Sequence, residues 1–489
     1  MPSSLHTRVA LPPCDITRLD ATALSAAIHS KAYSCTEVMQ AYLKRIDAVN
    51  PTYNAIISLK NESELLVEAK VHDELLAAGK SKGWLHGTPQ AIKDLSITAG
   101  IPTIKGSPLL QKNVPAEDAL MVQRMKTAGA IIIGKTNVPE FGLGSNTFNS
   151  VFGATKNAFD VSKTAGGSSG GAAVALATHM LPVADGSDFM GSLRNPAGWN
   201  NIYGMRPSQG RVPMWPSGNV WTAQLSTEGP MARTVKDLAR LLAVQAGFDT
   251  RTPLAIATPF DLTQALKPLE ESEIKSIRIL WLGDLNGYLP MEDGITSICE
   301  HGLQAISDKG FKIDTLASHG QLGFQPDLVW EAWLVWRKAL VGSDMAAYLA
   351  MPNGRALMKP EALAEHDASL GLTSAQFVSA SVLRSSFYQA MYKLLERYDA
   401  IALPSAQVWP FDINMRYPTE IVTAKGTVQM DTYHRWMEAT IYATFAGLPC
   451  ISVPVGFSQS HTGRGLPMGL QLIGKPQGDA ELLRLAALF

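Results

Sequence analysis

The sequence is poor in cysteine and in charge. Its 489 residues include four cysteines, scattered at Cys14, Cys35, Cys299 and Cys450. This spacing excludes a disulfide framework and a zinc knuckle, and it makes a reducing cytoplasm the expected location. Charged residues make up 17% of the chain, the net charge is −1, and no basic block occurs, so a nucleic-acid partner is not expected.

Long apolar stretches are missing as well. No run of 18 apolar residues is uninterrupted, which argues against a membrane span and a membrane partner. The segment 1–14 lacks the apolar core of a secretory signal, so none is expected. The chain is nevertheless 46% apolar, which is ordinary for a globular protein and sufficient for a large core.

Short apolar segments bounded by glycine or proline alternate with segments of helical periodicity. This alternation predicts an α/β fold. A capping box at Ser34 begins one expected helix, and Asn50–Pro51 is expected to end it. Further helices are expected at 21–29, 63–78, 119–128 and 234–247 and over much of 325–397, with strands at 55–59, 130–134, 181–184, 277–282, 400–404 and 450–455.

Two glycine-flanked serines and one lysine are the candidate chemistry. Ser168 lies in the segment 166–171, Ser192 follows 24 residues later, and Lys93 lies upstream. A serine nucleophile needs a base, and burial can lower the pKa of a lysine enough to supply one. The apolar run 173–176 indicates that the glycine-rich loop opens a buried helix rather than acting as a flexible linker.

These motifs resemble those of the amidase signature family, and so do the segments 134–141, 203–213, 447–454 and 466–474. The resemblance runs from about residue 17 to the C-terminus and is weakest over roughly 285–430. It implies one domain over residues 1–489, with a mixed central β-sheet flanked by helices. It also implies a variable helical cap over 310–430, and neither a metal ion nor an organic cofactor.

The family's roles transfer to matching positions of this chain. Ser192 matches the nucleophile, Ser168 the bridging serine and Lys93 the general base. The family usually has glycine at Met190, so we expect a negative φ there and a side chain that narrows the pocket. The oxyanion hole is expected from the backbone N–H groups of Phe189, Met190, Gly191 and Ser192.

The residues near Ser192 are apolar, and the segment 325–440 is rich in aromatic residues. Such a pocket favours aryl amides, with aryl carbamates (urethanes) and esters also plausible because the same attack serves all three. The expected partner is therefore a small molecule, and a homodimer stays open. Substrate contacts are expected at Gly144, Ser145, Asn146, Trp199, Trp330 and Trp333.

Other polar residues have a structural interpretation. Asp188 and Arg194 are expected to tie down the loop of Ser192, and Cys450 is expected in the core. Trp330, Trp333 and Trp336 share one side of a helix, as core or as the wall of a cap. The histidines have no ligand partners at metal spacing.

Three other functions compete with a stand-alone amidase. The segment 166–170 also fits the nucleophile elbow of α/β-hydrolases, but no strand is expected before it. An amidotransferase A-type subunit, which hydrolyses glutamine within a multi-subunit complex, resembles this family along its whole length. A non-catalytic binding protein is disfavoured by the presence of Lys93, Ser168 and Ser192 together.

Overall fold

The computed structural model describes residues 14–489, and its largest element is a mixed sheet of eight strands. β9, β10 and β11 are parallel to one another, and every other neighbouring pair is antiparallel. The strands lie in the order β10 (Lys312–Thr315), β9 (Arg278–Trp281), β11 (Ala400–Pro404), β15 (Pro467–Ile473), β14 (Cys450–Phe457), β7 (Tyr203–Arg206), β8 (Thr227–Ala232) and β6 (Val183–Asp188).

A smaller sheet carries the lysine of the candidate site. Its central strand is β3 (Ile131–Thr136), which is antiparallel to β1 (Ile56–Ile57) and parallel to β2 (Pro89–Lys93). β2 lies beside β6, so the two sheets meet where Lys93 ends β2. Two hairpins complete the strands: β4 (Phe148–Asn149) with β5 (Gly153–Ala154), and β12 (Glu420–Thr423) with β13 (Gly426–Gln429).

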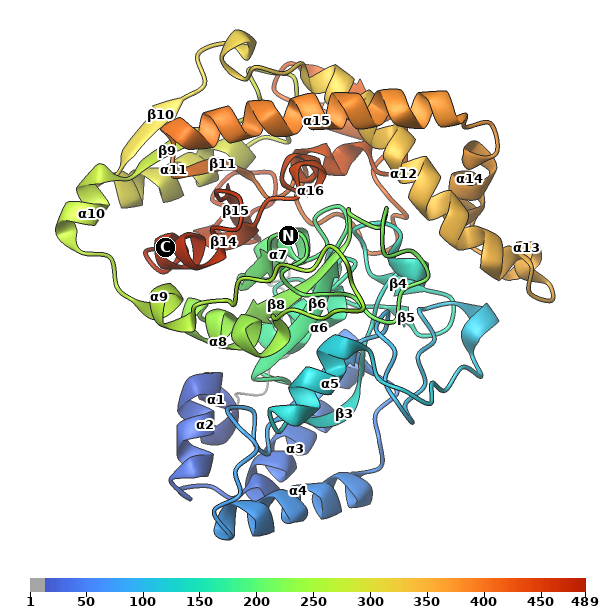
Figure 1. Ribbon diagram of the computed structural model, residues 1–489, viewed down its shortest axis with the longest axis vertical. Coiled ribbons are helices and arrows are strands. Elements are labelled where there is room, and N and C mark those ends of the chain that lie inside the picture. Colours follow the sequence, from blue (N-terminus) through green and yellow to red (C-terminus); the bar gives the residue numbers. More distant parts are fainter. Residues whose placement is uncertain (1–13) are drawn as a thin grey trace, which may run out of the picture.

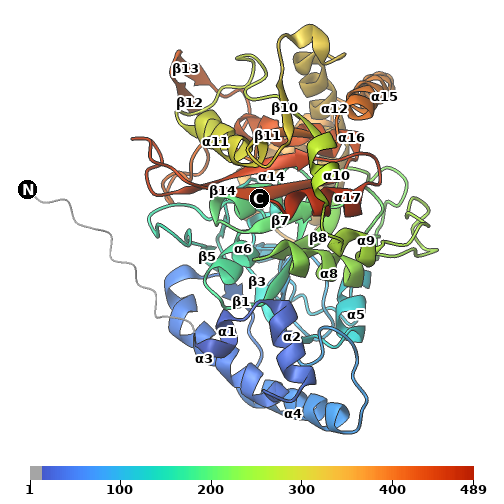
Figure 2. The same ribbon diagram turned by 90° about the vertical axis from the view of Figure 1, so that its left-hand side faces the viewer.

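Helices surround both sheets. Four N-terminal helices gather at one end of the molecule, at the bottom of Figure 1: α1 (Asp15–Arg18), α2 (Ala21–His29), α3 (Cys35–Tyr53) and α4 (Glu62–Ala77). A second group of helices packs around the two sheets (Figure 2). These are α5 (Leu120–Thr127), α6 (Gly170–Ala177), α7 (Arg194–Trp199), α8 (Val235–Gln245), α9 (Leu262–Leu266), α10 (Glu271–Ser276), α11 (Ile295–Ser307), α16 (Ile441–Ala446) and α17 (Asp479–Ala486).

Four more helices lie at the top and along the right side of Figure 1: α12 (Pro326–Leu349), α13 (Gly354–Leu357), α14 (Pro360–Ser369) and α15 (Ser374–Arg397). The helical prediction for 325–397 is therefore confirmed. The range 310–430 also contains β10 and β11, which belong to the large sheet. The helical part of that range is thus narrower than the cap expected from the sequence, because two of its segments complete the core.

Two boundaries were predicted wrongly. α3 does not stop at Asn50–Pro51 but continues through Pro51 to Tyr53. Proline removes one helical N–H here, close to the end of the helix, and the Asn50 side chain closes the turn by accepting from the N–H of Ala55 at 2.9 Å and of Ile56 at 2.8 Å. The strand expected at 181–184 is β6, which starts at Val183, after Pro182, and runs on to Asp188 along β8.

The fold class predicted from the sequence, a mixed α/β sheet flanked by helices, is confirmed. No helix within residues 14–489 combines the length and apolar character that crossing a membrane requires. The expectation about a secretory signal in residues 1–14 falls almost wholly on residues outside those described.

Candidate active site

Lys93 is fully buried and surrounded by serine oxygens. Its Nζ lies 2.8 Å from Ser168 Oγ and 2.8 Å from Ser169 Oγ. The same Nζ lies 2.9 Å from the Oγ and 3.0 Å from the carbonyl oxygen of Ser187, which is on β6. The lysine therefore faces one of the two predicted serines directly and can exchange a proton with it.

Burial lowers the pKa of Lys93 to about 7, although the carboxylates of Asp185, Asp188 and Glu228 raise it. Asp185 is the nearest of these groups to the Lys93 backbone, since its two oxygens accept from the Lys93 N–H at 3.1 and 3.3 Å. A lysine with this pKa is substantially neutral near pH 7, which a general base requires.

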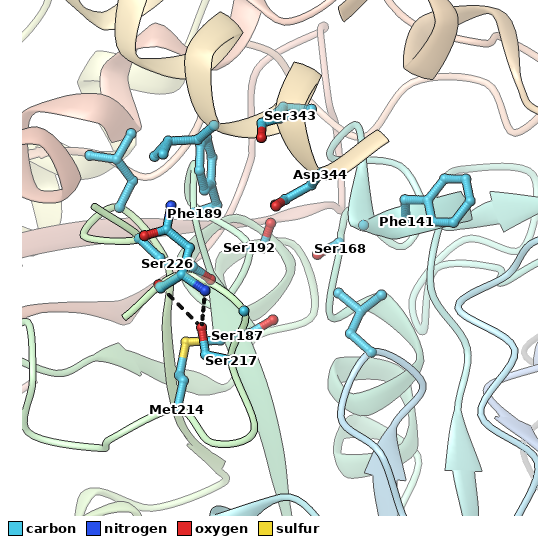
Figure 3. A pocket seen from close by; sticks show the side chains of 18 of the residues that line it. Phe141, Ser168, Ser187, Phe189, Ser192, Met214, Ser217, Ser226, Ser343 and Asp344 are labelled. Atoms are coloured by element: carbon cyan, nitrogen blue, oxygen red, sulfur yellow. Dashed lines mark hydrogen bonds between the residues drawn. The ribbon is translucent and has the colours of Figure 1, made fainter. Parts of the chain in front are cut away.

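Ser168 and Ser192 both line one cavity, and Figure 3 shows both side chains on the part of its wall that lies below α12 in this view. Ser168 lies just before α6, and Ser169 donates its backbone N–H to the Ser192 carbonyl at 3.2 Å. This bond joins the two serine loops. Residues 157–167 form only isolated bridges and no strand, so the strand that a nucleophile elbow needs is missing there.

The loop of Ser192 is fixed by a buried ion pair. Asp188 and Arg194 have no exposed side-chain surface, and the guanidinium binds both carboxylate oxygens at 2.9 Å. Although burial alone raises it, the pKa of Asp188 is lowered to about 2, chiefly by Arg194. The structural role predicted for this pair is confirmed, and Cys450 is buried as expected.

One of the four predicted oxyanion donors, the N–H of Gly191, is already used within the protein. Gly191 already donates its N–H to Asp188 Oδ1 at 2.8 Å, so it is not free for a substrate. The N–H groups of Phe189, Met190 and Ser192 donate to no acceptor within residues 14–489. Gly191 has φ +82° and a Cβ there would meet Thr440, whereas Met190 has the expected negative φ. Three donors of the predicted four are thus available.

The cavity holds about 780 Å³, and its lining combines apolar and polar side chains. α12 forms one side, and the loop between β7 and β8 forms another. The apolar lining includes Leu95, Phe141, Leu143, Phe189, Met190, Val212, Met214, Leu225, Leu340, Val341, Met345, Tyr348 and Met437.

Of the predicted substrate contacts, Gly144 lines the cavity, while Ser145 and Asn146 lie behind it. Ser145 Oγ donates to the Gly167 carbonyl at 2.6 Å, and the Asn146 side-chain amide donates to the Arg416 carbonyl. These two residues hold the Ser168 loop and the wall in place.

The three predicted tryptophans are buried side chains outside the cavity lining. Trp199 stacks on Trp436, with 6.1 Å between ring centroids. Trp330 and Trp333 lie on α12, and Trp333 packs against Phe189 at 5.5 Å. They support the wall from behind, because their faces of α12 and α7 turn toward the core.

Sequence reasoning missed several residues of the site. The hydroxyls of Ser169 and Ser187 contact Lys93. In the sequence, Ser169 only follows the predicted Ser168 and Ser187 only precedes Asp188, so neither had a signal of its own. Most of the loop 207–226 lines the cavity. The signal that could have indicated a binding role is that this loop is long and contains several prolines. Within residues 14–489, no group of three or more His, Cys, Asp or Glu side chains could hold a metal ion.

Comparison with known proteins agrees with this geometry. The family model described as Amidase matches residues 37–483. The A subunit of the glutamyl-tRNA(Gln) amidotransferase of Acidothermus cellulolyticus is 33% identical, covering 97% of this chain and 94% of the relative.

Two solved structures are similar over nearly the whole chain. A bacterial aryl acylamidase of the amidase signature family has a TM-score of 0.87 and 27% identity, covering 96% of this chain and 95% of its own. The A subunit of the glutamyl-tRNA(Gln) amidotransferase of Thermotoga maritima has a TM-score of 0.76 and 26% identity, covering 97% and 95%.

Proposed function

The chain belongs to the amidase signature family, and we propose that it hydrolyses amide C–N bonds through an acyl-enzyme on Ser192. One observation carries the proposal: a fully buried lysine lies 2.8 Å from Ser168 Oγ, and Ser168 lines the same cavity as Ser192. Among residues 14–489, neither serine has a hydrogen bond to a histidine, so Lys93 is the group that can take the proton.

The proton path needs two serines and one lysine. Ser192 Oγ attacks the carbonyl carbon and gives its proton to Ser168, while Ser168 gives its own to neutral Lys93. The path then reverses and protonates the leaving nitrogen, which breaks the C–N bond and leaves an ester on Ser192. Water, activated along the same path, releases the acid and restores the serine.

The negative charge that forms on the carbonyl oxygen needs donors already in place. The free N–H groups of Phe189, Met190 and Ser192 lie in the loop that Asp188 and Arg194 hold. Donors fixed before the reaction stabilise the transition state without reorganisation, by about 3 kcal/mol each.

For the substrate, we propose aryl amides, with aryl carbamates and esters as further substrates. The apolar side chains of the lining support this choice, because they bind rings and long chains. Ring stacking on side chains such as Phe141 or Phe189 adds about 0.5–1.5 kcal/mol.

A second candidate is the A-type subunit of an amidotransferase, which takes ammonia from glutamine. The sequence relatives favour it over the aryl amidase, since several amidotransferase A subunits are 31–33% identical to this chain. The partners would then be further subunits. For either candidate we propose the cytoplasm as the location, since all four cysteines are free thiols.

One panel of assays separates the candidates. The purified chain alone is offered L-glutamine, 4-nitroanilides, an aryl urethane and an aryl ester, and kcat/KM is measured for each. The aryl amidase predicts the highest value for a nitroanilide or urethane. If glutamine is the best substrate, or if turnover needs added amidotransferase subunits, the second candidate is correct.

A further inference from the structure

Three ionisable side chains line the cavity, and two of them already have partners. The Lys105 ammonium donates to the Tyr348 hydroxyl at 3.0 Å. The Arg337 guanidinium donates to Glu365 Oε1 at 2.6 Å and to the Tyr433 hydroxyl at 2.5 Å. Both cations are therefore held by the protein itself.

Asp344 is the third and differs from both. Its side chain makes no hydrogen bond or ion pair with any residue from 14 to 489, although Lys105 acts on it electrostatically. It lies on α12 seven residues after Arg337 and three after Val341, which places all three on the face that lines the cavity. Figure 3 shows the Asp344 carboxyl group directed from α12 toward the side of the cavity where Ser192 and Ser168 lie.

Asp344 is exposed and faces the open cavity, so water or a ligand satisfies its carboxylate. Its neighbours Leu340 and Val341 on the same helix are apolar, and Tyr348 adds an aromatic ring. Partial burial raises the pKa of Asp344, and the charge of Lys105 opposes that effect. Because Lys105 and Arg337 donate to other groups of the protein, the Asp344 carboxylate is left to attract a cation that enters with an apolar body.

We propose that Asp344 forms a subsite for a positively charged group, so that the preferred substrates are apolar amides whose arm beneath α12 carries a protonated amine. This inference rests on the proposed function, because it assigns a substrate feature to the same cavity. It goes beyond that function by naming the charge that the substrate carries and the residue that selects it.

The test compares two 4-nitroanilides of equal chain length, one with a 5-aminopentanoyl and one with a hexanoyl group. We expect Asp344→Asn to lower the ratio of their kcat/KM values, ammonium over methyl, by about tenfold. Asp344→Lys should turn the preference toward the 4-carboxybutanoyl analogue. Glu331→Gln is the matched control, because it removes a carboxylate from the exposed side of the same helix, and it should leave the ratio unchanged.

Binding to Ser192→Ala separates this inference from the proposed function. Calorimetry with the two anilides on the Ser192→Ala protein needs no turnover. A dissociation constant for the ammonium ligand that rises about tenfold on adding Asp344→Asn supports the subsite, even if wild-type protein hydrolyses neither compound. If Asp344→Asn leaves the ammonium-to-methyl ratio unchanged, in binding and in turnover, the subsite does not exist.

Discussion

The side chains around Lys93 and Ser192 and those of the other cavity walls are held in different ways. The first group, called the floor, consists of Lys93, the serines 168, 169, 187 and 192, and the Asp188–Arg194 pair. It is almost wholly buried, and Lys93 and the ion pair each have several polar partners. The second group, called the roof, consists of α12 on one side of the cavity and the loop 207–226 on another, and it carries the unpaired Asp344.

This difference assigns two tasks to two regions. In the proposed mechanism, the fixed hydrogen bonds of the floor keep proton donors, acceptors and oxyanion donors in place, so the floor would determine which bond is broken. A roof of apolar side chains on one helix and one long loop can vary in shape without disturbing the floor, so it determines which molecules enter. If the two regions have separate tasks, substitutions in the floor should change kcat or stability, and substitutions in the roof should change KM. The expected effects follow from the largest to the smallest.

Removing the proton path should abolish most of the activity. We expect Lys93→Ala and Ser168→Ala each to lower kcat by about 10³-fold or more, and the double variant to lose little beyond the worse single one, because the two groups act as a unit. Steady-state kinetics on a nitroanilide measure this. Ser386→Ala, an exposed serine on α15, is the control. Near wild-type turnover in folded Ser168→Ala would remove Ser168 from the path.

Removing Arg194 should damage the floor as a structure. Arg194→Ala leaves the Asp188 carboxylate buried without its main partner, and we expect a loss of about 3–5 kcal/mol in the free energy of unfolding. Urea denaturation measures it, with Arg464→Ala, an exposed arginine, as the control. A loss below about 1 kcal/mol would show that the pair does not hold the Ser192 loop.

The pH profile should follow Lys93. Its lowered pKa of about 7 predicts that kcat/KM rises about tenfold per pH unit below 7 and levels off above it, as the amine becomes neutral. Asp185 raises the pKa of Lys93, so Asp185→Asn should move the rise to lower pH. A flat profile from about pH 6 to 9, with chemistry rate-limiting, would contradict a neutral lysine base.

Changing the roof should have the smallest effect, and it should change KM rather than kcat. Val341→Ala removes two methyl groups from the cavity wall, so we expect KM for an aryl anilide to rise about three- to tenfold, with kcat nearly constant. The exposed Val382→Ala on α15 is the control. A fall in kcat without a change in KM would show that roof and floor are not independent.

The sequence predicted the floor better than the roof. Lys93, Ser168 and Ser192 stand in motifs whose spacing and glycines are local signals, and the fold class follows from alternating strands and helices. The partners of Lys93 on β6 could not be predicted, because Ser187 reaches the site through the pairing of distant segments. Trp330 and Trp333 lie outside the cavity lining for a similar reason, since helical spacing gives the shared face of α12 but not the direction in which that face turns.

We propose that Ser192, and not Ser168, is the nucleophile. A fluorophosphonate forms a stable bond with an activated serine, and peptide mapping by mass spectrometry locates it. We predict one label per chain, on Ser192, that is lost in Ser192→Ala and forms far more slowly in Lys93→Ala. A label on Ser168, or equal labelling of Ser192 with and without Lys93, would contradict it.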